Sequence, residues 1–331
     1  MNIVTSTSSA PLDLSSKIYV AGHTGLIGSA FMRRLTRDGY RSIITRSRNT
    51  LDLTNAPAVE SFFQQEQPEI VVLAAGRVGG ITDNKAYPAD YITENLAMEL
   101  NVIRSAHGAG VRQLLFFGSS CMYPRECSQP MNEEQILTGK PEPTSMSYAL
   151  AKLAGVQMCM AYNQQYGSMR FLPVIPNSAY GPNDNFDPAS SHVLSALLRR
   201  FHEARVHGAD TVTLWGTGQP RRELVYVDDI ADACMFLLHA DLGHVELPLN
   251  IGTGEDYSIR QLAETIAGIT GYDGRVEWDT EKPDGAPRKL LDCSRLHALG
   301  WKSKTSLLEG IKTTYQWYLN HEDLGQEGGH Q

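Results

Sequence analysis

A strand that passes directly into a glycine-rich turn and then a helix constrains this chain more than any other feature. Residues 17–30 read KIYVAGHTGLIGSA, in which Gly22, Gly25 and Gly28 recur at every third position. Glycines at such a turn let the backbone approach a pyrophosphate closely, and the phosphate charge then meets the N-terminus of the helix. The pattern predicts a dinucleotide site, with a purely structural turn as the alternative. The residues expected to form it are Gly22, His23, Thr24, Gly25, Leu26, Ile27 and Gly28.

The first half of the chain alternates short apolar runs with helical patterns. The apolar runs are separated by amphipathic stretches such as ENLAMELNVIRSAHGAG, and they lie at 17–21, 41–45, 69–75, 113–118 and 170–176. Continuous apolar strands separated by helices are typical of a parallel sheet covered on both faces. We therefore expect an α/β fold, a doubly wound parallel sheet of the Rossmann type, with a smaller mixed C-terminal substrate domain.

The alternation ends near residue 178, which sets the expected domain boundaries. LVYV (224–227) and PLNIG (248–252) look like further strands of the sheet, so the chain is expected to cross between two domains. The first domain is predicted to comprise 17–178 plus about 224–251, and the second about 179–223 plus 252–321. Residues 1–16 are predicted to be a disordered lead-in and residues 322–331 a frayed tail.

Composition restricts the class of partner. The net charge is −8 and no long Lys/Arg run occurs, so neither a nucleic acid nor an anionic membrane is expected as a partner. No apolar run of about 18 residues occurs, and the N-terminal stretch lacks the basic start and apolar core of a signal peptide. Five cysteines without a C-x-x-C pair indicate free thiols of a reducing compartment and no metal site. A cytoplasmic protein is therefore expected.

The end of the second predicted strand bears on the choice of cofactor. It reads ITRSRNTLDL, with Arg46 and Arg48 and no acidic residue before Asp52. An acid there would bind the ribose 2′-OH of NADH, whereas guanidinium groups suit the 2′-phosphate of NADPH. NADPH/NADP+ is therefore the predicted cofactor, unless these arginines are only solvated surface charges.

Tyr148 and Lys152 stand four residues apart in SYALAK, on one face of a predicted helix. A free tyrosine titrates near 10, and making it an acid-base group near pH 7 needs roughly 4 kcal/mol. We expect the Lys152 ammonium and the nicotinamide charge together to supply much of this by lowering the pKa of Tyr148. A Y-x-x-x-K pair alone is common in helices. It becomes specific together with the glycine turn and with Ser119 at the end of QLLFFG.

With these three features the chain resembles an extended short-chain dehydrogenase/reductase over about residues 17–320. The resemblance implies that Ser119 hydrogen-bonds the substrate oxygen, that Tyr148 transfers its proton, and that Lys152 holds the cofactor ribose. It also implies further cofactor contacts, made by Ala74, Ala75, Gly76, Gly118, Pro176, Asn177, Ser178, Ala179 and His192.

Longer stretches resemble one branch, the GDP-L-fucose synthases, which are GDP-4-keto-6-deoxy-D-mannose 3,5-epimerase/4-reductases. FFGSSCMYP, SYALAKLAG, YGPNDNF, WGTGQPRREL and KPDGAPRKLLD are among the segments that match in order. The resemblance implies that Cys121 is the epimerisation base and His192 its acid partner. It implies a homodimer formed through residues 94–107 and 147–162. Contacts to a GDP-sugar are implied for Arg77, Ser120, Arg200, Trp215, Arg222, Asp284 and Lys289.

The residue types suit this chemistry. A ketone at C4 acidifies the C–H bonds at C3 and C5, so inversion needs a base on one face of the sugar and an acid on the other. A thiol near pKa 8.5 and an imidazole near 6.5 both exchange protons near pH 7. Ser119 and Cys121, two residues apart on an extended backbone, are expected to face the same sugar ring. Reduction at C4 would follow, with Tyr148 protonating the new alkoxide.

Each of these roles has a simpler alternative. Cys121 could be a small buried hydrophobe, and His192 could cap the helix that follows it. Arg200 and Arg222 could be surface charges, although two arginines beside a tryptophan suit a diphosphate and a base.

Three departures from the usual pattern of the branch leave the exact sugar open. Ser178 stands where an asparagine is usual, Arg77 where a lysine is usual, and Thr24 where some members have an arginine. Another GDP-4-keto-6-deoxy hexose or a heptose is therefore an alternative substrate.

Other functions fit the chain less well. A 4,6-dehydratase would need an acid in place of Ser120-Cys121, and a simple 4-epimerase has no need for Cys121 and His192. A non-catalytic NADP-binding sensor is disfavoured because Tyr148 and Lys152 are both present.

Overall fold

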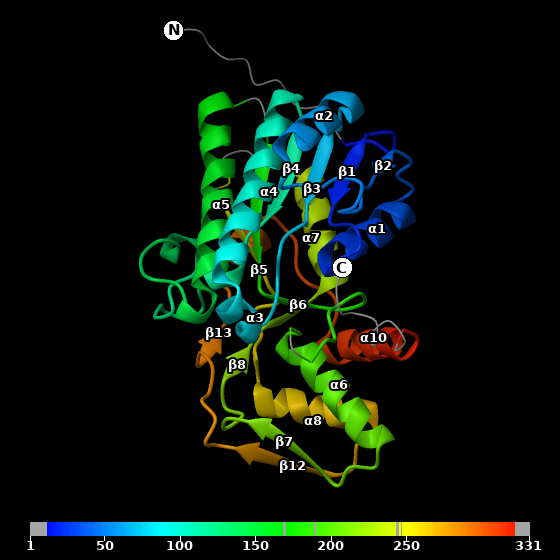
Figure 1. Cartoon of the computed structure of the whole chain (residues 1–331), viewed down its shortest axis with the longest axis vertical. Helices are drawn as coiled ribbons and strands as arrows, with labels where there is room; N and C mark the ends of the chain where they lie inside the picture. Colours follow the sequence, from blue (N-terminus) through cyan, green and yellow to red (C-terminus); the bar gives the residue numbers. More distant parts are fainter. Residues whose placement is uncertain (1–11, 168–169, 189, 243–244, 246, 322–331) are drawn as a thin grey trace.

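The computed structural model describes residues 12–321 except 168–169, 189, 243–244 and 246. Its elements form a larger lobe around a parallel sheet and a smaller lobe with α6 (Val193–Val206), α8 (Ile259–Thr270) and α10 (Leu307–Leu319) (Figure 1). The predictions made for residues 1–11 and 322–331 lie outside the described residues. None of the described helices is long and apolar enough to cross a membrane.

The larger lobe is built on a six-stranded parallel sheet in the order β10-β5-β4-β3-β1-β2. Central strands such as IYVA and IVVL are apolar throughout because both of their faces are covered. The predicted doubly wound fold is confirmed. The six strands are β1 (Ile18–Ala21), β2 (Ile43–Ile44), β3 (Ile70–Leu73), β4 (Gln113–Phe117), β5 (Arg170–Pro176) and β10 (Leu249–Ile251).

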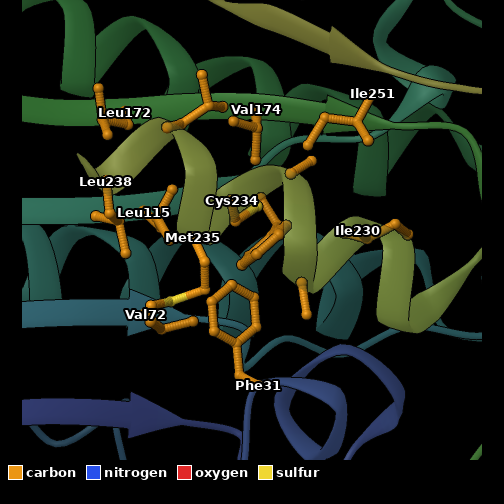
Figure 2. Packing of buried hydrophobic residues seen from close by; sticks show 14 of the residues in the cluster. Phe31, Val72, Leu115, Leu172, Val174, Ile230, Cys234, Met235, Leu238 and Ile251 are labelled. Atoms are coloured by element: carbon orange, nitrogen blue, oxygen red, sulfur yellow. The ribbon is translucent and has the colours of Figure 1, made fainter. Parts of the chain in front are cut away.

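Alternate strand residues divide the core between the two faces of this sheet, because successive side chains point to opposite sides. Val72 of β3 lies in one cluster with Phe31 and Met235 (Figure 2). These come from α1 (Leu26–Asp38) and α7 (Val227–His239), which cover that face. The neighbouring Val71 lies in the opposite cluster. The helices there are α2 (Ala56–Glu66), α4 (Pro88–Gly108) and α5 (Met146–Tyr166). With both faces covered, the carboxyl ends of the strands are left for binding.

The smaller lobe combines its three helices with short strands. β7 (Thr211–Trp215) pairs in parallel with β12 (Arg275–Asp279). β8 (Arg221–Arg222) lies between β11 (Tyr257–Ser258) and β13 (Arg288–Lys289).

The helix α8 begins with a capping box, which satisfies two of its free backbone donors. Ser258 Oγ accepts the Gln261 N–H at 3.1 Å, and Gln261 Oε1 accepts the Ser258 N–H at 2.9 Å.

Residues 12–16 form a turn, so the prediction of disorder is wrong for this part of the lead-in. Asp13 Oδ1 accepts the Ser15 N–H at 2.8 Å, and Leu14 O accepts the Arg41 N–H at 3.1 Å. Ser/Thr-rich composition concealed this turn, because side-chain and long-range backbone hydrogen bonds hold it together with the packing of Leu12 against the core.

Two segments are arranged differently from the predicted crossing pattern. β9 (Leu224–Tyr226) was expected in the main sheet, but it pairs with β6 (Ser178–Tyr180) in a separate two-stranded sheet. Residues 291–301, which include α9 (Ser294–Ala298), were assigned to the second domain. Leu291 and Leu296 nevertheless lie in the two cores of the larger lobe, because this segment returns to the sheet after β13. The predicted domain boundaries otherwise stay a prediction.

Candidate active site

The glycine turn leaves a backbone cradle at the N-terminus of α1. Gly22 has a φ of +78°, and a Cβ there would lie 2.7 Å from the Ala75 nitrogen after β3. A Cβ on Gly28 would lie 2.0 Å from the Gly22 oxygen, so the chain itself requires both glycines. Gly25, the N-cap of α1, is exposed, and a Cβ there would meet the Gly22 oxygen only at 3.5 Å. The open amides at this end of α1 fit a pyrophosphate.

Arg46 and Arg48 differ in how strongly they are engaged. The Arg46 guanidinium pairs with Glu66 at 2.5 Å and lies 5.4 Å from the centroid of the Phe62 ring. The Arg48 side chain is 69% exposed and lies 3.4 Å from Glu94. Because an exposed pair of this kind contributes little free energy, Arg48 is the arginine that can turn to a 2′-phosphate.

The other predicted cofactor residues lie where β3, β4 and β5 end. Ala74, Ala75 and Gly76 follow β3, and a Cβ on Gly76 would lie 3.6 Å from Lys152 Nζ. Pro176 ends β5, and Ser178 and Ala179 lie in β6. These strand ends share the edge of the sheet at which doubly wound folds bind dinucleotides.

Ser119, Tyr148 and Lys152 are brought together where β4 ends against α5. The Ser119 side chain lies near enough to the Tyr148 hydroxyl to act on the pKa of that phenol. Lys152 Nζ lies 5.9 Å from the centroid of the Tyr148 ring, one helical turn further along α5. The spacing of the Y-x-x-x-K pair therefore places both side chains on one face of α5, as expected from the sequence.

The groups of the protein itself shift the pKa of Tyr148 in the direction opposite to the lowering expected from the sequence, and the contribution of the nicotinamide charge stays a prediction. Burial raises the pKa of Tyr148 above its ordinary value, Cys121 and Glu99 raise it further, and the Ser119 hydrogen bond acts in the opposite direction. Lys152 Nζ lies 3.0 Å from Glu99 Oε1, so the charge of the ammonium is matched by a buried carboxylate.

Cys121 lies in a 3₁₀ turn, Ser120–Met122, and not on the extended strand expected from the sequence. Ser119 is extended and caps this turn, since its Oγ accepts the Cys121 N–H at 3.2 Å. The buried Ser120 lies between them. Ser119 and Cys121 therefore share one site because of a capping hydrogen bond, and strand periodicity has no part in it.

The Cys121 thiol lies beside a cation. Lys289 Nζ is 3.9 Å from Cys121 Sγ. Burial opposes ionisation, but Lys289 and hydrogen bonds with Ser119 and Ser145 hold the pKa of Cys121 below its ordinary value. All five cysteines lie within the described residues and are free thiols. Burial raises the pKa of the other four, which are Cys127, Cys159, Cys234 and Cys293.

The pairing of β8 with β13 places two cations side by side near Cys121. The parallel register sets Lys289 opposite Arg222. Burial lowers the pKa of the Arg222 guanidinium, and the charge of Cys121 opposes this shift. Lys289 and Arg222 therefore both act on the thiol, from strands of the smaller lobe.

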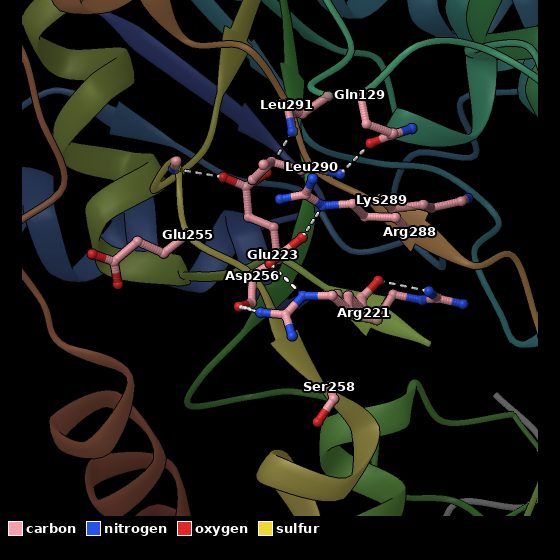
Figure 3. A network of polar contacts seen from close by, with 12 residues as sticks. Gln129, Arg221, Glu223, Glu255, Asp256, Ser258, Arg288, Lys289, Leu290 and Leu291 are labelled. Atoms are coloured by element: carbon pink, nitrogen blue, oxygen red, sulfur yellow. Dashed lines mark hydrogen bonds and ion pairs between the residues drawn. The ribbon is translucent and has the colours of Figure 1, made fainter. Parts of the chain in front are cut away.

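The residue pair just before this one in the β8–β13 register holds the two strands in place. Arg221 lies opposite Arg288, and both bind the buried carboxylate of Asp256 (Figure 3). Because alternate strand residues point to opposite faces, this clamp turns Lys289 and Arg222 to the other side.

Glu223 joins the two lobes next to this pair. Its buried carboxylate accepts the N–H groups of Thr253 at 2.7 Å, Gly254 at 2.8 Å and Leu291 at 2.9 Å (Figure 3). Asn177 Nδ2 also donates to it at 2.5 Å. Burial raises the pKa of Glu223, and these hydrogen bonds oppose the shift. The side chain of Asn177, predicted to contact the cofactor, is thus engaged with Glu223, because it points into the junction of the lobes.

Arg77 lines the site but its charge is matched within the larger lobe. Its guanidinium lies 2.7 Å from Glu94 and 3.3 Å from Asp90 of α4. It also lies 5.3 Å from the centroid of the Tyr91 ring, which contacts the Tyr148 ring edge-on at 6.3 Å. Arg77 therefore borders the group of Ser119, Tyr148 and Lys152 through Tyr91.

His192 is exposed at the N-cap of α6, and its side chain makes no capping bond within the described chain. The segment before it lies against the turn after Arg77, since the Gly80 N–H donates to Ser190 O at 3.0 Å. The alternative that His192 serves as a capping side chain is therefore not supported.

Three predicted substrate residues lie in the smaller lobe. Arg200 is exposed on α6, and Trp215 is 69% exposed at the end of β7. Asp284 Oδ1 accepts the Thr217 N–H at 2.8 Å, and its Oδ2 accepts the Thr217 hydroxyl at 2.7 Å. Among the described residues, no hydrogen bond or ion pair joins these three to Cys121 or Tyr148.

Glu99, Asp256 and Glu223 were missed by the sequence analysis. Glu99 could have been noticed, because it occupies the buried stripe of α4 together with Val102 and Ile103. A charged residue in such a stripe is an exception that needs a partner. Asp256 and Glu223 stand in polar loop-like sequence that carries no comparable signal. In the described part of the chain, no group of three or more His, Cys, Asp or Glu side chains could hold a metal ion.

Comparison with known proteins adds a family and several relatives. The sequence profile of the NAD dependent epimerase/dehydratase family matches residues 18–252. GDP-L-fucose synthase 1 of Arabidopsis thaliana is 51% identical over 311 residues, which cover 93% of this chain and 95% of that protein.

Two solved structures share both the fold and most of the length. A GDP-6-OMe-4-keto-L-xylo-heptose reductase from C. jejuni superposes with a TM-score of 0.88 at 37% identity, covering 94% of this chain and all of the other. A GDP-L-fucose synthetase from Naegleria fowleri, bound to NADP, has a TM-score of 0.87 at 25% identity and covers 96% and 98% of the two chains.

Proposed function

The chain belongs to the NAD dependent epimerase/dehydratase family and, within it, to the GDP-L-fucose synthases, and on this premise we propose its reaction. The enzyme epimerises GDP-4-keto-6-deoxy-D-mannose at C3 and C5 and reduces C4 with NADPH, which yields GDP-L-fucose. The observation that carries this proposal is the grouping of Ser119, Tyr148 and Lys152 with a Cys121 thiol whose pKa is lowered.

Epimerisation begins with the Cys121 thiolate, which Lys289 stabilises from 3.9 Å. A C–H bond at C3 or C5 breaks as an S–H bond forms, and the electron pair moves toward the C4 oxygen as an enolate. Ser119 and the protonated Tyr148 can donate hydrogen bonds to that oxygen. The His192 imidazolium then gives up an N–H proton on the opposite face, and the electron pair of the enolate returns to carbon to form the new C–H bond, which inverts the centre.

Reduction uses the same C4 oxygen. NADPH, when bound, supplies the hydride that C4 receives. The cradle at Gly22, Gly25 and Gly28 would hold its pyrophosphate, and Arg48 would meet its 2′-phosphate. Tyr148 gives its proton to the C4 alkoxide, and Ser119 orients the same oxygen. Lys152 reaches the turn at Gly76, where it would contact the nicotinamide ribose.

The nucleotide part of the substrate is assigned to the smaller lobe. The exposed face of Trp215 suits stacking of a guanine base. Arg200 offers an exposed guanidinium to the diphosphate. Lys289 and Arg222, held by the clamp on Asp256, lie nearer the sugar because they act on Cys121.

A heptose substrate is the second candidate. The observation in its favour is the close superposition on the C. jejuni heptose reductase, at 37% identity. The higher identity to a GDP-L-fucose synthase, 51% over 93% of the chain, favours the 6-deoxyhexose.

A panel of sugar nucleotides tests the proposal. Purified enzyme with NADPH should consume the cofactor with GDP-4-keto-6-deoxy-D-mannose and release GDP-L-fucose, identified by NMR. Consumption only with a GDP-4-keto heptose would transfer the assignment to the second candidate. A folded enzyme that consumes NADPH with neither would refute both.

The homodimer implied by the resemblance has a suitable surface. Leu96 and Leu100 of α4 are 37% and 48% exposed, and Leu150 of α5 is 44% exposed. The opposite sides of these two helices pack into the core. Light scattering should give the mass of a dimer, and Leu100→Glu combined with Leu150→Glu should give a monomer. A dimer that survives both changes would place the interface elsewhere.

Two further points are proposals. The five free thiols support a cytoplasmic location, because reducing compartments keep thiols unpaired. The division into a cofactor domain and a substrate domain is supported by the separate apolar core of the smaller lobe.

A further inference from the structure

We propose that Glu99 is a positioning residue of the reductive step: by pairing with Lys152 it keeps Tyr148 a protonated phenol until the C4 alkoxide forms. This inference deepens the proposed function and rests on it. It assigns a role to a buried acid that the epimerase and reductase chemistry does not otherwise use.

The pair is closed off from water. Lys152 Nζ and Glu99 Oε1 are 3.0 Å apart, and the two side chains are 5% and 2% exposed. Lys152 Nζ also lies 4.9 Å from the centroid of the Phe116 ring. Neither Glu99 oxygen has a hydrogen-bond partner within the described part of the chain, so its contact with Lys152 is an ion pair. Glu99 therefore directs its charge at Lys152.

The neighbouring helix makes room for this carboxylate. A Cβ on Gly155 of α5 would lie 2.7 Å from Glu99 Oε2 and 2.2 Å from the Phe116 ring. Glycine is less favourable than alanine in a helix interior, so the space is obtained at some loss of helix stability. Gly155 of α5, about one turn from Lys152, therefore leaves the space that the Glu99 carboxylate occupies.

Stability alone does not account for the pair. Taking two charges out of water costs several kcal/mol per ion, and apolar residues of similar size often replace a buried pair without loss. Glu99 also lies in the buried stripe of α4, next to the apolar residues Val102 and Ile103. The effect of the pair on its surroundings is therefore the better explanation for it.

The surroundings of Tyr148 are biased toward the protonated phenol. Glu99 and Tyr91 face it from α4, Ser119 and Cys121 from the end of β4, and Lys152 from its own helix. The negative charges of Glu99 and Cys121 oppose a phenolate, whereas the Ser119 hydrogen bond favours one. The only cation of this set is neutralised by Glu99.

This bias suits a proton donor. In the reductive step the O–H bond of Tyr148 breaks and an O–H bond forms at C4, while C4 receives the hydride of the cofactor. The phenolate left on Tyr148 then takes up a proton from solvent, which restores the proton donor. Without Glu99, the Lys152 ammonium would favour the phenolate before the substrate arrives.

Glu99→Gln tests this directly, since it removes the charge and keeps the shape. The rate of NADPH consumption should fall at high pH, and the midpoint of this fall should lie about one to two pH units lower than in the unaltered enzyme. This is the shift expected for an uncompensated ammonium 5.9 Å from the ring at a protein-like dielectric constant. Glu99→Asp, which keeps the charge, should have a midpoint close to that of the unaltered enzyme. The surface control Glu60→Gln on α2 should match the unaltered enzyme.

Titration of Tyr148 by NMR gives a readout that needs neither substrate nor cofactor. With [¹³Cζ]tyrosine, and Tyr148→Phe for assignment, the resonance of the unaltered chain should keep its phenol position up to about pH 10, the ordinary range of tyrosine. In Glu99→Gln it should move to its phenolate position at a lower pH.

The outcomes separate the inference from the proposed function. The role of Glu99 would be overturned by a folded Glu99→Gln variant in which the pH midpoint of the rate and that of the Tyr148 titration both match the unaltered chain. If Glu99→Gln does not fold, a Tyr148 already ionised near neutrality in the unaltered chain would overturn it equally. An enzyme that never consumes NADPH would refute the proposed function, while the NMR titration would still decide the role of Glu99.

Discussion

Replacing Lys289 with methionine removes the cation beside Cys121 and nearly preserves side-chain length. At the observed Nζ–Sγ distance of 3.9 Å, two unit charges attract by about 4 kcal/mol at an effective dielectric constant near 20 and by about 1 kcal/mol in bulk water. The thiol is only partly buried, so the loss lies between these limits. This corresponds to a rise in the pKa of Cys121 of about 1 to 3 units.

The sign of the effect on activity follows from the role of a base. A higher pKa leaves less thiolate at pH 7, so solvent deuterium exchange at C3 and C5 should fall by about 10-fold to 1000-fold. The rising limb of exchange against pH should move upward by the same 1 to 3 units.

Alkylation of the protein without ligands separates thiol ionisation from substrate binding. The rate of iodoacetamide modification at Cys121, followed by mass spectrometry against pH, should have its midpoint below the ordinary thiol value near 8.5 in the unaltered chain. In Lys289→Met the midpoint should rise. Lys312→Met, an exposed site on α10, is the matched control and should leave it unchanged. A folded Lys289→Met with the midpoint of the unaltered chain would refute the electrostatic reasoning.

Three further changes test separate parts of the site. Tyr148→Phe should lower NADPH consumption by about 100-fold or more while exchange at C3 and C5 persists; loss of both in a folded protein would contradict separate roles. Cys121→Ser should suppress that exchange, and exchange at the original rate would remove Cys121 from the mechanism. Glu223→Gln places an NH₂ group against buried N–H donors, so urea unfolding should show a loss of about 2 to 3 kcal/mol. The exposed control Glu264→Gln on α8 should change little, and an equal loss there would argue against the junction role of Glu223.

Much of the larger lobe could be predicted because its signals are local. Apolar runs fell on the six strands of the sheet, and the glycine turn fell between β1 and α1. The Y-x-x-x-K pair lies one helical turn apart whatever surrounds it, so the grouping of Tyr148 with Lys152 followed from spacing alone.

The errors arose where local pattern and packing disagree. Cys121 was placed on an extended strand, but the Ser119 cap bends the chain into a 3₁₀ turn immediately after β4. LVYV has the composition of a sheet strand, yet β9 pairs with β6, since composition does not specify a pairing partner.

By itself the sequence determined the fold class and the glycine turn, and it predicted which side chains react, because periodicity and motif spacing act over a few residues. Only the tertiary structure decided the electrostatic character of those side chains. The cation beside Cys121 comes from a position 168 residues further along the chain, and the anion that pairs with Lys152 comes from another helix. The strength of a charge interaction depends on distance through space and on burial, and these are properties of the packed molecule. Tyr148 therefore has a raised pKa and Cys121 a lowered one, although their sequence surroundings suggested the opposite shift for Tyr148.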